Sequence, residues 1–243
     1  MDIERIEELA RRASERAQVQ YLHFLDPADC AHAHDSANRV HVRAEFFGGH
    51  SQAERMMCAF LPDWEDPENL NWPLVGLYIQ WNARYAAVAH RDVLGAILAL
   101  GIKREVLGDI LVGEGYAICF VSEDMAGYLL ENLLEIGHAS VRIEPYENQA
   151  QIPARKMEMI HATLASLRLD AMVAAAYRIS RTKAVEAIRA GKVKHNHREE
   201  THTDAKVEPG DMLSMQGFGR AQFLEMGNHS QRGRIHVDIG RLV

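Results

Sequence analysis

The fold of the C-terminal third is decided by the stretch Ser180-Arg181-Thr182-Lys183-Ala184-Val185-Glu186-Ala187-Ile188-Arg189-Ala190-Gly191-Lys192-Val193. Ser180 is a preferred helix N-cap and Gly191 is the residue type that often follows a helix end, so a helix is predicted over about residues 181–190. Its buried face recurs at helical spacing and comprises Ala184, Val185 and Ile188. A second apolar stripe predicts a preceding helix over about 169–178. Two short helices joined by a tight turn indicate a helix-turn-helix-like unit.

Two cations, Arg181 and Lys183, lie in the first turn of the predicted second helix. The helix dipole disfavours positive charge at this end by ~0.3–1 kcal/mol for each residue. Free backbone N–H groups, dipole and cations together favour a bound anion, and phosphate is the obvious one. An isolated run of charge is more often a solvated surface, but this position argues for a site. We expect one cradle for a folded polynucleotide, formed by Arg168, Arg181, Lys183, Lys192 and Arg220.

After the second helix the apolar residues alternate as they do in strands. Strands are predicted over residues 193–196, 212–215 and 235–239. Turns are predicted at Pro209-Gly210-Asp211 and Gln231-Arg232-Gly233. The glycines of Gly217-Phe218-Gly219-Arg220 permit a ligand to approach the backbone closely, and Arg220 supplies a charge.

Charge is distributed unevenly along the 243 residues, whose formal net charge is −7. From Ile152 onward there are 15 Lys and Arg against 10 Asp and Glu, a net of +5. Residues 1–151 hold 12 against 24, a net of −12. A basic module joined to an acidic one indicates that the basic part meets a polyanion. The acidic part is expected to stay off the phosphate backbone, and either discourages non-specific RNA binding or faces protein.

The first 150 residues alternate predicted helices and strands. Helices are predicted over about 3–18, from Pro27 onward, and over 51–61, 92–100 and 123–136. Asp26 is the expected N-cap of the helix that begins at Pro27, and Asp92 is the expected N-cap of the helix over 92–100. Strands are predicted over 40–47, 74–89 (a hairpin around Asn82-Ala83-Arg84), 110–121 (a pair) and 141–145. From residue 74 the order β, α, β, β, α, β indicates a split-βαβ antiparallel sheet with helices on one face. The chain is therefore predicted to be α+β, with an N-terminal α/β subdomain (1–73), a middle domain (74–148) and a C-terminal domain (153–243, core 164–222).

The basic module resembles the RNA-binding domain first known from ribosomal protein S-four. The match comprises Arg168-Leu169-Asp170, Ser180 to Ala184, Ile188 to Val193, Asn196 and Val207-Glu208-Pro209-Gly210-Asp211. The resemblance implies binding to structured RNA. The residues expected to contact RNA are Arg168, Ser180, Arg181, Thr182, Lys183, Arg189, Lys192, Lys194, Asn196 and Arg220.

Nearly the whole chain is similar to the bacterial YlmH family. The similarity is carried by Phe24-Leu25-Asp26-Pro27, Phe47-Gly48-Gly49, Ala53-Glu54-Arg55, the run from His90 to Glu105, and Gly108-Asp109-Ile110. It implies an RNA-recognition-like fold for residues 74–148 and binding to ribosomal RNA of the large ribosomal subunit and to tRNA. It also implies a non-enzymatic role in ribosome-associated quality control, where the family supports alanine tailing of a stalled nascent chain.

Two other functions remain open at this point. One is a ribosome-assembly or cell-division accessory that uses RNA binding for localisation. The other is an RNA-modifying enzyme of the pseudouridine-synthase type, which would need a catalytic aspartate motif in the first 150 residues, and we find none. His90-Arg91-Asp92 matches a kinase catalytic loop by letters alone, because no glycine-rich loop or DFG accompanies it.

The remaining features predict no cofactor, no metal and no membrane segment. Cys30, Cys58 and Cys119 form no CxxC pair and read as small buried hydrophobes. The start is acidic and unlike a signal peptide, and no apolar run approaches the ~20 residues of a membrane span, so we expect a cytoplasmic protein. We also expect a monomer. Arg91, Lys103 and Arg104 have two possible roles. They could form a second, smaller RNA contact, or they could serve in salt bridges and at helix ends.

Overall fold

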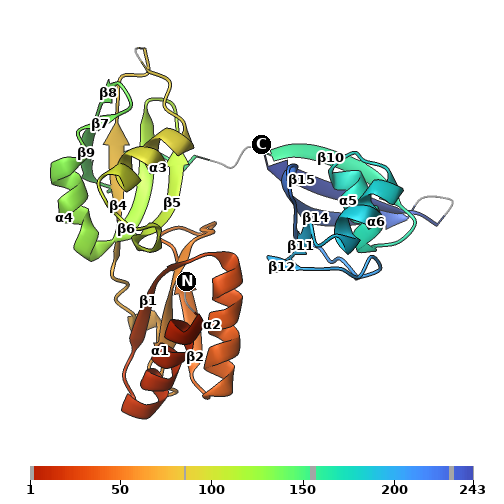
Figure 1. Cartoon of the computed structure of the whole chain (residues 1–243), viewed down its shortest axis with the longest axis horizontal. Coiled ribbons are helices and arrows are strands. Elements are labelled where there is room, and N and C mark those ends of the chain that lie inside the picture. Colours follow the sequence, from red (N-terminus) through yellow and green to blue (C-terminus); the bar gives the residue numbers. More distant parts are fainter. Residues whose placement is uncertain (1–2, 85, 154–156, 230–232, 243) are drawn as a thin grey trace. The chain divides into compact units, whose positions relative to one another are not determined.

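The computed structural model describes residues 3–84, 86–153, 157–229 and 233–242. The chain divides into two compact units, Met1–Pro153 and Ala154–Val243. Both consist of helices packed on antiparallel sheets (Figure 1), so the chain is α+β as predicted. The turn expected at Gln231 and Arg232 lies outside the described residues.

The first unit begins with a layer of two helices on a three-stranded sheet. Its elements are α1 (Ile3–Arg16), β1 (Gln20–Leu25), α2 (Pro27–Arg39), β2 (Arg43–Phe47) and β3 (Met56–Leu61), with strand order β1-β3-β2. The predicted cap of α2 is confirmed, because the Asp26 side chain accepts hydrogen bonds from the N–H groups of Ala28 and Asp29. Beneath the helices lies an apolar core that includes Ile6, Leu22, Ala33 and Phe60.

The helix predicted over residues 51–61 is wrong, because Met56–Leu61 is the central strand β3. This strand pairs with β1 on one side and β2 on the other, and both of its faces are covered. An uninterrupted apolar run has no period that separates a buried strand from a buried helix, which is the physical reason for the error.

The middle part of the first unit has the predicted β, α, β, β, α, β order. Its elements are η1 (Pro67–Asn69), β4 (Leu74–Gln80), α3 (His90–Ala99), η2 (Arg104–Val106), β5 (Leu107–Val112), β6 (Tyr116–Ser122), α4 (Glu123–Asn132), β7 (Glu135–Ile136), β8 (Ala139–Ser140) and β9 (Arg142–Pro145). The four long strands form an antiparallel sheet of order β5-β6-β4-β9, as in a split-βαβ fold. The helices pack on the face that carries Leu77 and Ile79.

Two local predictions in this part are wrong. Residues 74–89 form no hairpin among the described positions, because β4 pairs with the distant strands β6 and β9 instead. Asp92 is not the N-cap of α3, which is Ala89. Asp92 stands three residues further along, and its carboxylate accepts the Ala89 N–H at 2.9 Å. The carboxylate therefore satisfies the helix start from inside the first turn.

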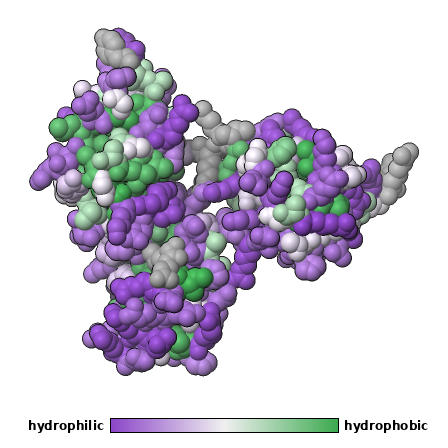
Figure 2. Space-filling model, in the orientation of Figure 1, coloured by the Kyte–Doolittle hydropathy of each residue, from purple (hydrophilic) through white to green (hydrophobic). Residues whose placement is uncertain are grey.

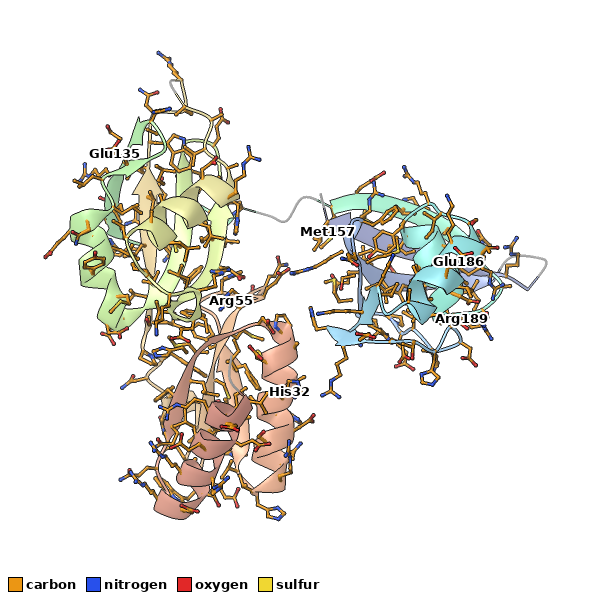
Figure 3. All side chains as sticks on the ribbon, in the orientation of Figure 1. His32, Arg55, Glu135, Met157, Glu186 and Arg189 are labelled. Carbon is orange, nitrogen blue, oxygen red and sulfur yellow. The ribbon has the colours of Figure 1, made fainter. Side chains whose placement is uncertain are left out.

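A buried polar joint connects the two layers of the first unit. The Asp109 carboxylate accepts the backbone N–H groups of Glu54 at 2.7 Å and Arg55 at 3.0 Å, and its Oδ2 lies 3.2 Å from His50 Nε2. Figure 3 labels Arg55 where the layers meet. Its guanidinium donates to the carbonyl oxygens of Phe24, Leu107 and Arg104 at 2.8–3.1 Å. Gly108 lets the layers close, since a Cβ there would lie 2.5 Å from Phe24.

The surface of the first unit carries apolar side chains over its middle part, visible as green in Figure 2. Large exposed ones in this part are Leu98 on α3, Tyr128 on α4 and Leu134. Among the described helices, none combines the length and the apolar character needed to cross a bilayer. The three cysteines are free and buried, as predicted for small hydrophobes.

The second unit is a six-stranded antiparallel sheet with two helices on one face. Its elements are β10 (Met157–Leu164), α5 (Leu169–Ala176), α6 (Arg181–Arg189), β11 (Val193–His195), β12 (Arg198–Glu199), β13 (Met212–Met215), β14 (Gly219–His229) and β15 (Ile235–Leu242). The strand order is β10-β15-β14-β13-β11-β12. The helices bury Met172 and Ile188 against Leu213, Phe223 and Ile239 of the sheet. We propose 1–73, 74–148 and 153–243 as domain limits, since each part has an apolar core of its own. A fourth apolar cluster, formed by Phe24, Met57, Tyr78, Ile118 and Phe120, joins the first two parts.

Candidate nucleic-acid interface

Two of the predicted cations, Arg168 and Arg181, meet at one buried carboxylate. Arg181 donates from Nε to Asp170 Oδ2 at 3.0 Å and from Nη2 to Oδ1 at 3.2 Å, and Arg168 Nε donates to Oδ1 at 3.3 Å. The Asp170 side chain is 4% exposed, whereas that of Arg181 is 55% exposed. Burial alone would raise the pKa of Asp170, but the hydrogen bonds and charges of the two arginines lower it below its usual value. One carboxylate therefore orients two guanidinium groups and neutralises one of their two charges.

The N-terminus of α6 has the geometry that the sequence predicted. The Ser180 hydroxyl oxygen accepts the Lys183 N–H at 3.2 Å, and the Lys183 side chain is exposed. Among the described α-helices, α1 to α5 each carry an acidic residue in the first turn, and α6 carries none. No acidic residue of α6 itself therefore balances the positive end of its dipole. The Asp170 carboxylate of α5 is shared by Arg168 and Arg181, and Lys183 adds a further cation, so a net positive charge remains that favours binding of an anion.

Lys183 and Lys192 line the same groove beside α6. Lys192 follows the helix end at Gly191, which adopts a φ of +67°. Neither lysine forms an ion pair among the described residues. The same groove is bordered by Phe218, a large exposed aromatic side chain that sequence reasoning did not include among the contact residues. The sequence does contain a signal for it, because an aromatic residue between two glycines, as in Gly217-Phe218-Gly219, indicates a ring exposed on a tight turn.

Arg220 and Lys194 do not join the cations of α6. Cross-strand pairing places Lys194 opposite Ser214, and Ser214 opposite Arg220, so the three residues share one face of the sheet. Their neighbours Val193, Met215 and Ala221 are buried under the helices. Successive side chains alternate between faces, so Lys194 and Arg220 lie on the face away from α5 and α6. The single cradle expected from the sequence is thus two separate groups, with Glu199 directly opposite Lys194 on β12.

Three other predicted contact residues differ in how they are used. The Asn196 amide is taken up inside the domain, since it donates to Asp211 Oδ1 at 2.7 Å and accepts the Met212 N–H at 2.9 Å. Thr182 is exposed in the first turn of α6. Arg189 is exposed in the last turn, and Figure 3 labels it together with Glu186 on α6. Asn196 therefore shapes the turn between β11 and β12 and offers little to a ligand.

The three cations weighed as a second RNA contact, Arg91, Lys103 and Arg104, differ in exposure. Arg91 and Lys103 are 90% and 81% exposed, with ion-pair distances of 3.7 Å to Asp92 and 3.9 Å to Glu105. Arg104 is half-buried and donates from Nη1 to the Gly108 carbonyl oxygen at 3.3 Å. Burial lowers the pKa of Arg104. Arg104 thus belongs to the joint within the first unit, and Arg91 and Lys103 remain available to solvent.

Comparison with known proteins gives two domain matches and one full-length relative. The S4 domain matches residues 167–213, which contain α5, α6, β11, β12 and the first two residues of β13. A family described as "Putative RNA-binding domain in YlmH" matches residues 67–150. The chain is 31% identical over 235 residues to the "Ribosome-associated protein quality control protein P2" of Bacillus subtilis, covering 96% of this chain and 91% of that protein. The chain belongs to the YlmH family.

A solved structure adds evidence on the fold of this YlmH-family chain. It is the "Cell division protein ylmH from Streptococcus pneumoniae", 20% identical, with a TM-score of 0.54. The superposition covers 62% of this chain and 92% of the other. At this identity the likeness concerns the fold alone. Both matched domain families are RNA-binding by description or by type, which agrees with the cations of α6. In the described part of the chain, no three His, Cys, Asp or Glu side chains gather as metal ligands would.

Proposed function

We propose that this chain is a non-enzymatic RNA-binding factor that binds the large ribosomal subunit and tRNA and supports alanine tailing of stalled nascent chains. Binding to ribosomes would place it in the cytoplasm. The family and the name of the Bacillus subtilis relative support a role in ribosome-associated quality control. One observation carries the RNA-binding mechanism, namely the cationic N-terminus of α6 inside an S4 domain, with Arg168 and Arg181 oriented by Asp170.

This geometry fits phosphate recognition rather than base recognition. Arg181 bonds to Asp170 through Nε and Nη2, and its side chain is half-exposed; the Lys183 side chain is exposed to solvent. Cations that meet phosphates set affinity and position without reading sequence. Binding is therefore expected to weaken steeply as salt rises, with a slope of about −0.9 per phosphate contact for a duplex.

The test is binding of the full chain to a structured RNA at several salt concentrations. We expect Lys183→Ala to weaken binding to every RNA by a similar factor and to reduce the slope of log affinity against log salt by about one. Lys206→Ala is the matched control, because Lys206 lies in the same domain with its charge paired to Glu208 at 2.6 Å. An unchanged affinity and slope for Lys183→Ala would refute the assignment of α6 as the phosphate site.

The cellular role is tested by sedimentation with ribosomal particles. The proposal expects co-sedimentation with large subunits that carry peptidyl-tRNA, and release at high salt. Recovery with immature subunits alone would instead favour a role in ribosome assembly. Absence from all ribosomal particles at low salt would contradict both.

A further inference from the structure

The groove beside α6 has a volume of 440 Å³ and walls of three chemical kinds. It is bordered by apolar side chains, cations and polar hydrogen-bonding groups, among them Ile179, Phe218, Lys183, Lys192, Glu186 and Gln216. The size falls within the range of about 300–1,000 Å³ that is usual for small-ligand sites. A groove of this size has room for one flat, partly apolar group, and a nucleic-acid helix is far too wide to enter it.

Phe218 borders the groove, and a purely structural role does not account for its exposure. Its side chain is 49% exposed, although aromatic rings of this size usually lie in the core. It stands in the three-residue turn between β13 and β14, where its N–H donates to the Met215 carbonyl oxygen at 3.0 Å. The adjacent glycines have φ values of +82° and +87° and allow this tight turn.

Tyr177 on the helix side holds the ring in place. The two rings meet edge to face, with centroids 5.9 Å apart. The buried Tyr177 hydroxyl lies 3.0 Å from the Leu213 carbonyl oxygen and 3.1 Å from that of Gly219, at the two strands that flank the turn. Phe218 therefore packs against Tyr177 on one side and is open to solvent on another, as a stacking platform for a base would be.

The charges around the groove suit a nucleotide. Lys183 and Lys192 stand at its border, and a backbone phosphate needs such partners. Glu186 and Gln216 add a carboxylate and an amide, and among the described residues no ion pair occupies the Glu186 carboxylate. A carboxylate accepts two parallel hydrogen bonds best from a base that offers two adjacent donors, and the pairing edge of guanine offers N1–H and N2–H.

We propose that this groove binds one unstacked nucleotide of the RNA, with its base on Phe218, its phosphate at Lys183 and Lys192, and guanine selected by Glu186. This inference rests on the proposed RNA-binding function and adds base recognition to it. Base-aromatic stacking is sequence-tolerant, so Phe218 supplies affinity for any unpaired base while Glu186 supplies the choice among bases.

The experiment compares the full chain and its variants on two RNA hairpins by fluorescence anisotropy. One hairpin carries a single bulged guanosine and the other is the same stem fully paired. We expect Phe218→Ala to weaken binding to the bulged hairpin by roughly 5- to 150-fold and to leave the paired hairpin unchanged. Phe218→Trp keeps a stacking surface and should retain the preference. Met226→Ala is the matched control, because Met226 is an exposed apolar residue on β14 of the same domain and outside the groove.

Glu186→Gln tests the choice of base with hairpins that differ in the bulged nucleotide. The wild-type chain should prefer a bulged guanosine to a bulged uridine, and the variant should lose that preference while it still distinguishes bulged from paired RNA. Equal effects of Phe218→Ala on both hairpins, or no effect on either, would overturn the nucleotide site. Such a result leaves the proposed RNA binding intact, because Lys183→Ala would still weaken binding to both hairpins; if Lys183→Ala changes neither hairpin, the proposed phosphate site fails as well.

Discussion

Arg55 in the first unit and Arg181 in the second both lie near an aspartate, yet their surroundings differ. The Arg55 guanidinium donates to three backbone carbonyl oxygens of neighbouring segments. Arg181 donates to one buried carboxylate, which it shares with Arg168, and its side chain is 55% exposed. The first arrangement uses a cation to join two layers of the protein. The second presents excess positive charge to solvent, so the number of internal partners and the exposure separate a structural arginine from the one proposed to bind phosphate.

The largest effect is expected at the joint of the first unit. Asp109→Ala removes the acceptor of two backbone N–H groups and the partner of His50, so unfolding should become easier by about 3–5 kcal/mol. Urea denaturation followed by tryptophan fluorescence reports on this unit, because Trp64, Trp72 and Trp81 all lie in it.

Glu8→Ala serves as the control for that measurement. Glu8 forms exposed ion pairs with Arg5 and Arg12 within α1, and water screens such pairs, so its loss should change stability far less than the loss of Asp109. A loss below about 1 kcal/mol in Asp109→Ala would mean that the joint is held by its apolar contacts alone. The RNA affinity of the second unit should not change in either variant.

A smaller effect is expected on the acid sensitivity of the same joint. Burial alone would raise the pKa of Asp109, but the hydrogen bonds from His50, Glu54 and Arg55 lower it overall. The folded pKa thus lies below the unfolded one, so this group stabilises the fold above pH about 4 and loses that contribution as the pH falls through the folded pKa. Asp109→Asn should be less stable at pH 7 and should show a flatter decline between pH 5 and pH 2 than the wild type, by the same fluorescence signal. An equally steep decline would assign the acid sensitivity to other carboxylates.

The smallest effect is expected at the exposed cations of the first unit. Arg91→Ala and Lys103→Ala should each lower affinity for structured RNA by less than about twofold, as is usual for exposed charges with weak partners. Filter binding at low salt measures this, with Lys183→Ala as the positive control. A loss of fivefold or more would show that the first unit carries a phosphate contact of its own, and the contrast between the two regions would then be one of degree.

Much of the local structure could be predicted because its causes lie within a few residues. The caps at Asp26 and Ser180 depend on one side chain and the next three N–H groups, and both are confirmed. The β, α, β, β, α, β order also follows from local periodicity. The pairing partners of strands do not follow from local periodicity. The predicted helix over Met56–Leu61 and the predicted hairpin after Leu74 are wrong for this reason.

The candidate site shows the same division. Cations at a helix N-terminus are visible in the sequence, and Lys183 is where it was expected. The pairing of Arg181 with Asp170 joins residues 11 positions apart across two helices, and no local pattern shows it. Arg220 was placed with the α6 cations because its strand register was unknown, and the register puts it on the opposite face. For Arg104 the sequence leaves an RNA contact and a structural role both open, because its charge is visible in the sequence and its burial is not.

The second unit starts and finishes on two strands that are hydrogen-bonded neighbours. Met157 at the start of β10 pairs with Leu242 at the end of β15, and the register runs without interruption to Leu164 and Ile235. A force applied at Met157 and Leu242 would break these hydrogen bonds one after another, in the unzipping geometry, instead of loading all of them together in shear. The domain should therefore yield to low mechanical force. It should also tolerate circular permutation, with Leu242 joined to Met157 by a short loop and new termini opened elsewhere.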